Sequence, residues 1–109
     1  MSAIDDVAAE RKRQIEVEGW DAAHDKSHDS GELATAGACY ALVNSNYVTY
    51  IDLLGVDVAI QVKRLVDTIW PWGRQWWKPK RDRRRNLVRA AALIVAEIDK
   101  MDGEKKDGN

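Results

Sequence analysis

Residues 83–101 read RRRNLVRAAALIVAEIDKM, and this stretch decides the fold. Five of its apolar residues recur at alternating intervals of four and three positions: Leu87, Ala91, Ile94, Ile98 and Met101. That spacing places them on one side of an α-helix and is typical of a seam that packs against another helix. Asp82 stands directly before the stretch and suits the N-cap position. The sequence therefore predicts a final helix over 83–101.

Three earlier segments also have helical patterns. They cover residues 3–18, a stretch that starts near Gly31-Glu32 and stops at Asn44-Ser45-Asn46, and residues 57–69. Residues 47–57 predict either an irregular segment or a short hairpin. We expect an all-α fold, a small bundle of about four helices, with a tryptophan-rich loop before the last one. Residues 1–102 then form a single domain, and 103–109 form a polar, frayed tail.

Composition excludes several classes of protein. The net charge of −1 over 109 residues argues against a general nucleic-acid coat, which carries a large positive excess. Cys39 is the only cysteine, so no internal disulfide is possible and a reducing cytoplasm is the natural setting. The first residues lack the pattern of a signal peptide, and no apolar run reaches membrane-spanning length. We expect a cytoplasmic protein with no membrane partner.

The loop before the last helix holds four of the five tryptophans in the stretch WPWGRQWW, residues 70–77. Two prolines and a glycine in 70–79 make it a poor helix interior. Trp70 and Trp77 flank the loop and are expected to fill core or interface space. Trp72 and Trp76, with Trp20 from an earlier loop, are the candidates for stacking on a nucleotide base.

A basic segment overlaps the start of the last helix: Lys78, Lys80, Arg81, Arg83, Arg84, Arg85 and Arg89. Backbone N–H groups at a helix N-terminus attract anions, and arginines in the first turn strengthen that attraction. Lys80, Arg84 and Arg85 are therefore candidates for holding phosphate. The alternative is that the segment is a solvated charge run or pairs with the acidic residues of 16–32.

Both histidines lie in the loop 18–32, and each is followed by an aspartate: His24-Asp25 and His28-Asp29. Three interpretations stay open. The pairs hydrogen-bond the local backbone and cap the following helix; or His24, Asp25, His28 and Glu32 hold a divalent metal; or the imidazoles contact a phosphate or ribose without a metal.

The first helix carries Glu10, Gln14 and Glu18 at intervals of four, so the three stack along one side. Acidic ladders of this kind bind magnesium in all-α nucleotide pyrophosphohydrolases, where carboxylates hold the ions that bridge phosphates. One rung here is glutamine. The alternative is that these carboxylates pair with neighbouring arginines on a solvated surface.

Taken together, the ordered motifs resemble a small family of phage and prophage proteins. The matching pieces are Glu10-Arg11-x-Arg13-Gln14-Ile15, Glu18-Gly19-Trp20, His24-Asp25, His28, Gly31-Glu32-Leu33-Ala34, Cys39-Tyr40-Ala41, Trp70-Pro71-Trp72, Trp76-Trp77-Lys78-Pro79 and Arg84-Arg85-x-Leu87-Val88-Arg89-Ala90. The resemblance implies phage origin and leaves the chemistry open. By analogy, small phage proteins often counter host defence, and several capture nucleotide signals.

The leading functional prediction is a nucleotide-binding protein that sequesters a host defence signalling nucleotide and needs no cofactor. Its expected ligand-binding residues are Trp20, His24, Asp25, His28, Trp72, Trp76, Lys80, Arg84 and Arg85. The alternatives are a metal-dependent nucleotide phosphohydrolase and a protein–protein inhibitor of a host enzyme. We also expect a homo-oligomer, formed through the small-residue helix at 32–43 or through the 87/91/94/98 seam.

Overall fold

The computed structural model describes residues 2–17, 31–43 and 57–107. Within these ranges the regular structure consists of four α-helices and one short 3-10 helix: α1 (Ala3–Glu16), α3 (Glu32–Leu42), α4 (Val58–Ile69), η2 (Arg74–Trp76) and α5 (Arg83–Asp107). The all-α prediction is confirmed. The prediction for 47–57 concerns a segment that lies, apart from Asp57, outside the described residues.

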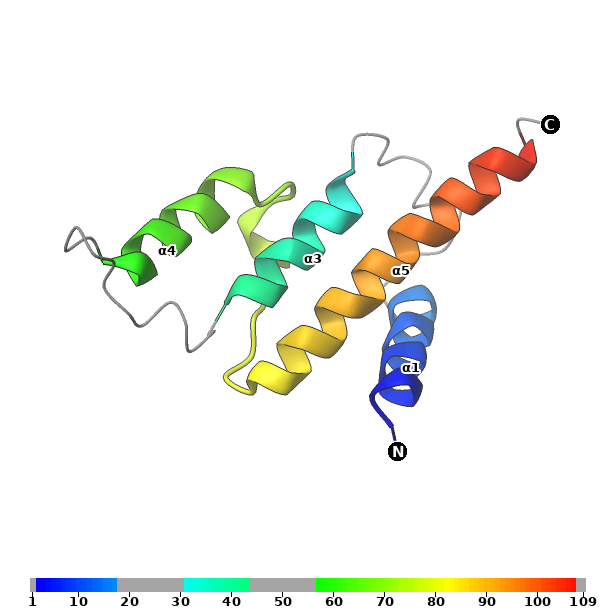
Figure 1. The fold of residues 1–109 in the computed structure, drawn as a ribbon, viewed down its shortest axis with the longest axis horizontal. Helices are drawn as coiled ribbons and strands as arrows, with labels where there is room; N and C mark the ends of the chain where they lie inside the picture. The colour runs from blue at the N-terminus through cyan, green and yellow to red at the C-terminus, as the bar shows by residue number, and fades with distance from the viewer. Residues whose placement is uncertain (1, 18–30, 44–56, 108–109) are drawn as a thin grey trace.

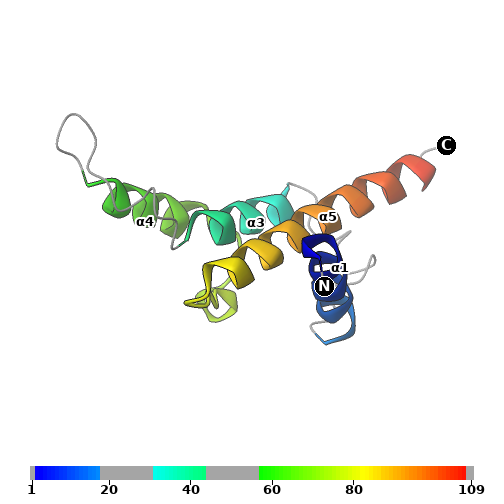
Figure 2. The same ribbon diagram turned by 60° about the horizontal axis from the view of Figure 1, so that its bottom comes forward.

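The longest helix, α5, organises the molecule. It runs antiparallel to α3 on one side and packs against α1 on the other, while α4 lies beyond α3 (Figure 1). Figure 2 shows the same order from another side, with α1 beneath α5 and α4 extending the line of α3. Every other helix is therefore positioned directly or indirectly by α5.

The helix starts follow local capping chemistry. Ser2 and Asp5 form a capping box at α1, and Asp57 accepts hydrogen bonds from the N–H groups of Ala59 and Ile60 at α4. Asp82 accepts from the N–H of Arg84 at 3.0 Å, so the predicted N-cap of α5 is confirmed. The helix runs to Asp107, past the predicted end at Met101, because Gly103 is the one strong helix-weakening residue in 102–107.

The α3–α5 contact forms the core. Leu33, Ala36 and Tyr40 of α3 bury against Ala90, Leu93 and Ala96 of α5. Gly37 permits the two backbones to approach closely, since a Cβ there would lie 3.0 Å from the carbonyl oxygen of Ala90. Ala36 and Gly37 of α3 thus serve packing within the chain.

The start of α3 has no side-chain cap of its own. Gly31 occupies the N-cap position in the left-handed region, with φ of 83°. The Glu97 carboxylate of α5 accepts a hydrogen bond from the N–H of Ala34 at 3.3 Å and lies 3.7 Å from the ammonium of Lys100. An acidic group from another helix therefore satisfies one of the free N–H groups at this N-terminus.

The buried faces of α5 and α1 are not the ones that apolar spacing alone would select. The seam of α5 leaves Ile94, Ile98 and Met101 exposed, at 43, 51 and 59 %, while the neighbouring face with Leu93 is buried. Because α5 is apolar on more than one side, the heptad spacing identified an apolar face but not the one that packs within the chain. In α1 the buried side is polar and centred on Glu10, whereas the apolar Ile4 is 79 % exposed.

Candidate ligand-binding site

The tryptophan loop is built on an aromatic cluster around Tyr40 of α3. The rings of Trp70 and Trp77 lie 5.8 and 4.8 Å from the Tyr40 ring, and Trp72 lies 5.5 Å from Trp70 at near right angles. All three indoles pack against the core and are partly buried. Trp70 and Trp77 fill space as predicted. Trp72, predicted to stack on a base, contributes to the same cluster, and that packing restricts its ring.

Trp76 differs from its three neighbours. It lies on η2 with 53 % of its surface exposed, and the ammonium of Lys78 is 6.0 Å from its ring centre. An exposed indole beside a lysine offers a π-face and a cation to one ligand. Trp76 is thus the predicted stacking residue whose ring is most available in the described part of the chain.

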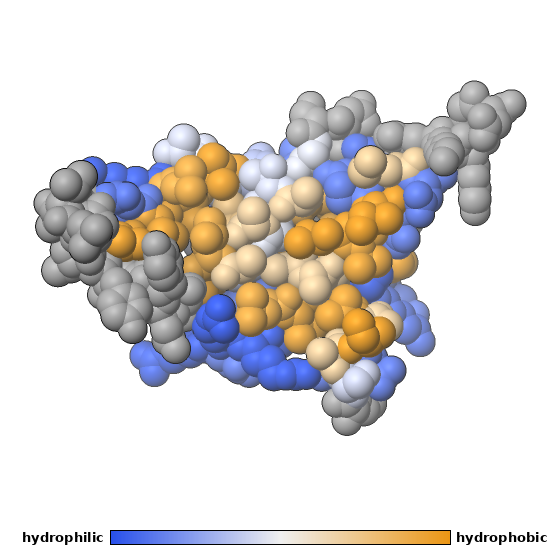
Figure 3. Space-filling view, viewed as in Figure 1, coloured by the Kyte–Doolittle hydropathy of each residue, from blue (hydrophilic) through white to orange (hydrophobic). Residues whose placement is uncertain are grey.

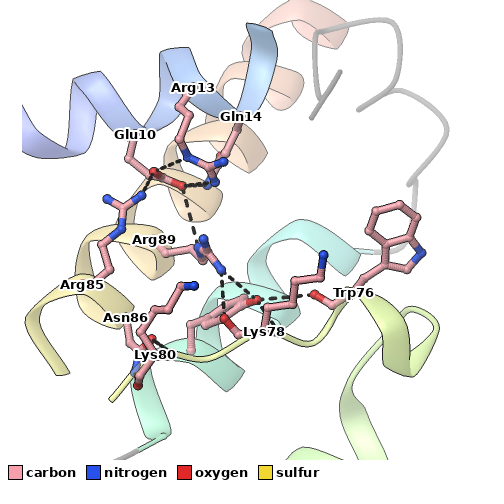
Figure 4. A network of polar contacts seen from close by, with 10 residues as sticks. Glu10, Arg13, Gln14, Trp76, Lys78, Lys80, Arg85, Asn86 and Arg89 are labelled. Atoms are coloured by element: carbon pink, nitrogen blue, oxygen red, sulfur yellow. Dashed lines mark hydrogen bonds and ion pairs between the residues drawn. The ribbon is translucent and has the colours of Figure 1, made fainter. Parts of the chain in front are cut away.

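Tyr40 and Arg89 anchor the loop that follows Trp76. The Tyr40 hydroxyl accepts from the Lys78 N–H at 3.2 Å and donates to the Trp76 carbonyl at 3.5 Å. The Arg89 guanidinium donates to the Lys78 carbonyl at 3.1 Å and to the Tyr40 hydroxyl at 3.4 Å (Figure 4). Tyr40 and Arg89 therefore hold the backbone of Trp76 and Lys78 in place, while the side chains of these two residues stay exposed.

Asn86 fixes the next part of the loop. It is buried, its Oδ1 accepts from the Lys80 N–H at 2.8 Å, and its Nδ2 donates to the Lys80 carbonyl at 2.7 Å. This reciprocal pair leaves the Lys80 side chain exposed beside Arg81 and Arg83, which are also exposed. The basic segment is thereby displayed along one edge, which Figure 3 shows as a hydrophilic lower border.

Arg84 and Arg85, predicted to hold phosphate, both pair with carboxylates of α1. Arg84 lies 2.6 Å from Asp6, and Arg85 donates to Glu10. The Arg84 pair is largely exposed, with 60 % of the arginine side chain accessible, whereas the Glu10 side chain is completely buried. Both residues are therefore paired within the chain, but their partners Asp6 and Glu10 lie outside the acidic block of 16–32 that the sequence suggested.

Glu10 is the centre of this network (Figure 4). It accepts two hydrogen bonds from Arg13, each of 2.8 Å, and one from Gln14 at 3.2 Å, and the Arg89 Nε lies 3.8 Å away. Burial alone would raise the pKa of Glu10, but the hydrogen bonds and charges of Arg13 and Arg85 outweigh it and hold the pKa below its usual value. Glu10 therefore pairs with arginines, as the alternative to the magnesium ladder predicted, but in a buried position rather than on a solvated surface.

A cleft of about 250 Å³ opens beside this network, between α1 and the start of α5. Arg13, Arg84 and Arg85 line it together with Asp6, Glu10 and Asp82. Arg84 and Arg85 already pair with Asp6 and Glu10, so an incoming anion would compete with these carboxylates for the guanidinium groups. Asp6 is the cheapest to displace, because its pair with Arg84 is the exposed one.

Several predicted site residues lie outside the described part of the chain: Trp20, His24, Asp25 and His28. Glu32 is described, at the first position of α3. Within 2–17, 31–43 and 57–107, no group of three His, Cys, Asp or Glu side chains is placed to hold a metal ion. Three segments were predicted to form the site: the loop with both histidines, the tryptophan loop and the basic segment at the start of α5. The structure describes the last two, and Arg89 of α5 connects them through its hydrogen bonds to the Lys78 carbonyl and the Tyr40 hydroxyl.

The residues that make this junction were not singled out by the sequence. Tyr40 entered the sequence analysis only as part of the motif Cys39-Tyr40-Ala41, and Asn86 was given no role. The available signal was the tyrosine itself, because a hydroxyl buried in the small-residue helix needs a hydrogen-bond partner from another segment. Nothing in the sequence indicates that the Asn86 side chain forms hydrogen bonds with the backbone of Lys80, six positions earlier.

Comparisons with protein-family models, curated proteins and solved structures find no match to this chain. No helix among the described residues has the length and apolar character needed to cross a bilayer.

Proposed function

We propose that this protein binds a small phosphorylated nucleotide and sequesters it, with Trp76 stacking on the base. The observation that carries the proposal is the exposed indole of Trp76 with the Lys78 ammonium 6.0 Å from its ring. A nucleotide presents a π-face and an anion at short separation, so this pair matches both of its parts.

The surrounding loop supports binding because it is already ordered. Hydrogen bonds from Tyr40, Arg89 and Asn86 fix the backbone of residues 76–80. A ligand that binds a fixed loop loses less free energy to ordering than one that binds a mobile loop. The structural residues of the loop therefore contribute to affinity without contacting the ligand.

The phosphates are proposed to lie along the basic edge formed by the exposed Lys78, Lys80, Arg81 and Arg83. Arg84 can join them by exchanging Asp6 for phosphate, since that pair is exposed. Arg85 stays on the buried Glu10 and is assigned a positioning role. His24, Asp25 and His28 remain proposed contacts to sugar or phosphate, and Trp20 a proposed second stacking residue.

The biological setting is also proposed. A phage protein in the host cytoplasm that holds a signalling nucleotide blocks the signal without a reaction, so binding alone is sufficient and no cofactor is needed. Assembly as a homo-oligomer is a separate proposal, because it concerns a different surface of the molecule.

Calorimetric titration of the full chain with a panel of cyclic dinucleotides and ADP-ribose derivatives tests the proposal. We expect at least one saturable interaction, which Trp76→Ala weakens about tenfold or more through loss of stacking. Ile60→Ala is the matched control, because Ile60 is 49 % exposed near the start of α4, at the end of that helix remote from Trp70.

The charge contribution is tested in the same titration. Lys78→Ala is expected to weaken binding about tenfold, as for loss of a charge-assisted hydrogen bond, whereas Lys12→Ala, on the exposed side of α1, leaves it unchanged. No heat with any ligand of the panel, or equal affinity in wild type and Trp76→Ala, would overturn the proposal.

A further inference from the structure

The exposed seam of α5 is an apolar helix face that no described helix covers. Ile94, Ile98 and Met101 are exposed at 43, 51 and 59 %, and Leu87 and Ala91 on the same side are half-buried. The spacing of four and three residues keeps all five on one line along the helix. All five side chains are apolar.

A second, smaller stripe lies next to it on α3. Ala34, Ala38 and Ala41 recur at intervals of four and three, with Ala38 exposed and the other two half-buried. The two stripes adjoin on the same side of the α3–α5 pair, because a Cβ at Gly37 would lie 3.2 Å from Cγ1 of Ile94. We call the combined surface the α3–α5 face. Figure 3 shows hydrophobic residues gathered over these two helices.

We propose that a second copy of this chain covers the α3–α5 face, in a twofold dimer that places α5 of each protomer over α3 of its partner. The face is self-complementary, since bulky side chains line its α5 half and alanines line its α3 half. A twofold axis that lies in the plane of the face, between α3 and α5 and parallel to them, sets the bulky half of one copy on the small half of the other. Ile94 and Ile98 then fill the space above Ala34 and Ala38 of the partner subunit.

The size of the face indicates how tightly a second copy can bind. At about 1.5 Å per residue the α5 half advances about 21 Å from Leu87 to Met101, the α3 half advances about 10 Å from Ala34 to Ala41, and each helix is about 10 Å wide. The resulting area of about 300 Å² is within the range of the largest apolar patches on monomers, which are often functional. It is below the roughly 800 Å² per partner of a standard interface. A dimer that dissociates on dilution is therefore expected rather than a permanent one.

The shape of the face favours a second copy as the occupant. Its α5 half carries Leu87, Ile94, Ile98 and Met101, and its α3 half carries three alanines. The same surface on another copy therefore supplies both the bulky side chains and the small ones that they pack on.

Sedimentation equilibrium of the full chain over a wide range of concentration tests the proposal. Wild type is expected to shift from monomer to dimer mass as concentration rises. Ile98→Glu should weaken the dimer on the order of a hundredfold, because it buries a charge in an apolar contact and repeats it across the twofold axis. Ile60→Glu is the matched control, since Ile60 is 49 % exposed on α4, and it should dimerise as wild type does.

Circular dichroism establishes that each variant retains its helices, and Ala38→Glu provides a second disruption on the opposite half of the face. The proposal is overturned if wild type stays monomeric throughout, if the folded Ile98→Glu and Ala38→Glu variants dimerise as tightly as wild type, or if Ile60→Glu is equally disruptive. A monomer would leave the face to a different partner. The inference is independent of nucleotide binding, because Trp76→Ala should leave the dimer intact and Ile98→Glu should leave the nucleotide titration intact.

Discussion

Glu10 offers the sharpest test of how α1 is held to α5. Its side chain is completely buried and accepts hydrogen bonds from Arg13, Gln14 and Arg85, with Arg89 close by. Glu10→Gln keeps the size of the side chain and removes its charge. The guanidinium of Arg89, whose side chain is 12 % exposed, would then have no carboxylate in the described network to balance it.

The expected cost follows from that burial. Breaking a buried ion pair by neutralising one partner costs about 3–5 kcal/mol, because the other charge remains buried. We take about 3 kcal/mol, since Arg13 and Arg85 are partly exposed and can turn to water. For a domain of this size the melting temperature should fall on the order of 15 °C.

Thermal and urea unfolding followed by circular dichroism measure the effect. Glu16→Gln is the matched control on the same helix, because its pair with Lys12 is 3.9 Å long and 61 % of its side chain is exposed. That variant should lose less than about 1 kcal/mol. A Glu10→Gln variant as stable as the control would refute the view that the buried carboxylate secures α1.

Four further outcomes are expected. Because the pKa of Glu10 is lowered, its contribution to stability is present above the unfolded-state value of 4.5 and is lost as pH falls below it, so the acid-side slope of unfolding free energy against pH should be smaller in Glu10→Gln. Gly37→Ala should destabilise by about 1–3 kcal/mol in urea, since the new Cβ would lie 3.0 Å from backbone and this crowding exceeds the gain in helix propensity. Asn86→Ala should cost about 2 kcal/mol in the same assay through loss of both bonds to the Lys80 backbone, and an unchanged midpoint would contradict that role. Cys39 is buried and its pKa is raised by burial, so a thiol reagent should label it slowly in the native protein and rapidly in urea, and fast native labelling would contradict its placement.

The helices themselves follow from local sequence. Asp82 and the apolar periodicity of 83–101 were enough to place α5, and Ser2, Asp57 and Gly31 stand where the other described helices start. Such signals are local, because a cap and its helix are covalent neighbours. The extension of α5 to Asp107 was missed, since polar residues without an apolar partner give no periodic pattern.

The faces were harder to predict than the helices. In α1 the apolar Ile4 is exposed, whereas the polar Glu10 and Gln14 are buried. Burial of that polar side depends on Arg85 and Arg89, which are about 75 residues away in sequence. Periodicity reports where apolar residues gather, but it does not report which polar side chains will find a partner across the fold.

The site was predicted in part. Trp76 and the basic segment come together as expected in one loop, because they are close in sequence. The roles of Trp72 and Arg85 depend on neighbours from α3 and α1, so composition alone could not separate a free side chain from a packed or paired one.

The carboxylate of Glu97 has a consequence for how the chain acquires its structure. Because the first turn of α3 takes a hydrogen-bond acceptor from a helix 63 residues further along the sequence, α3 cannot complete its start until α5 has docked. Both helices should then form in one cooperative transition. A chain truncated before Glu97 would expose not only the apolar side of α3 but also an unsatisfied helix terminus, making the early part of the polypeptide a poor autonomous unit.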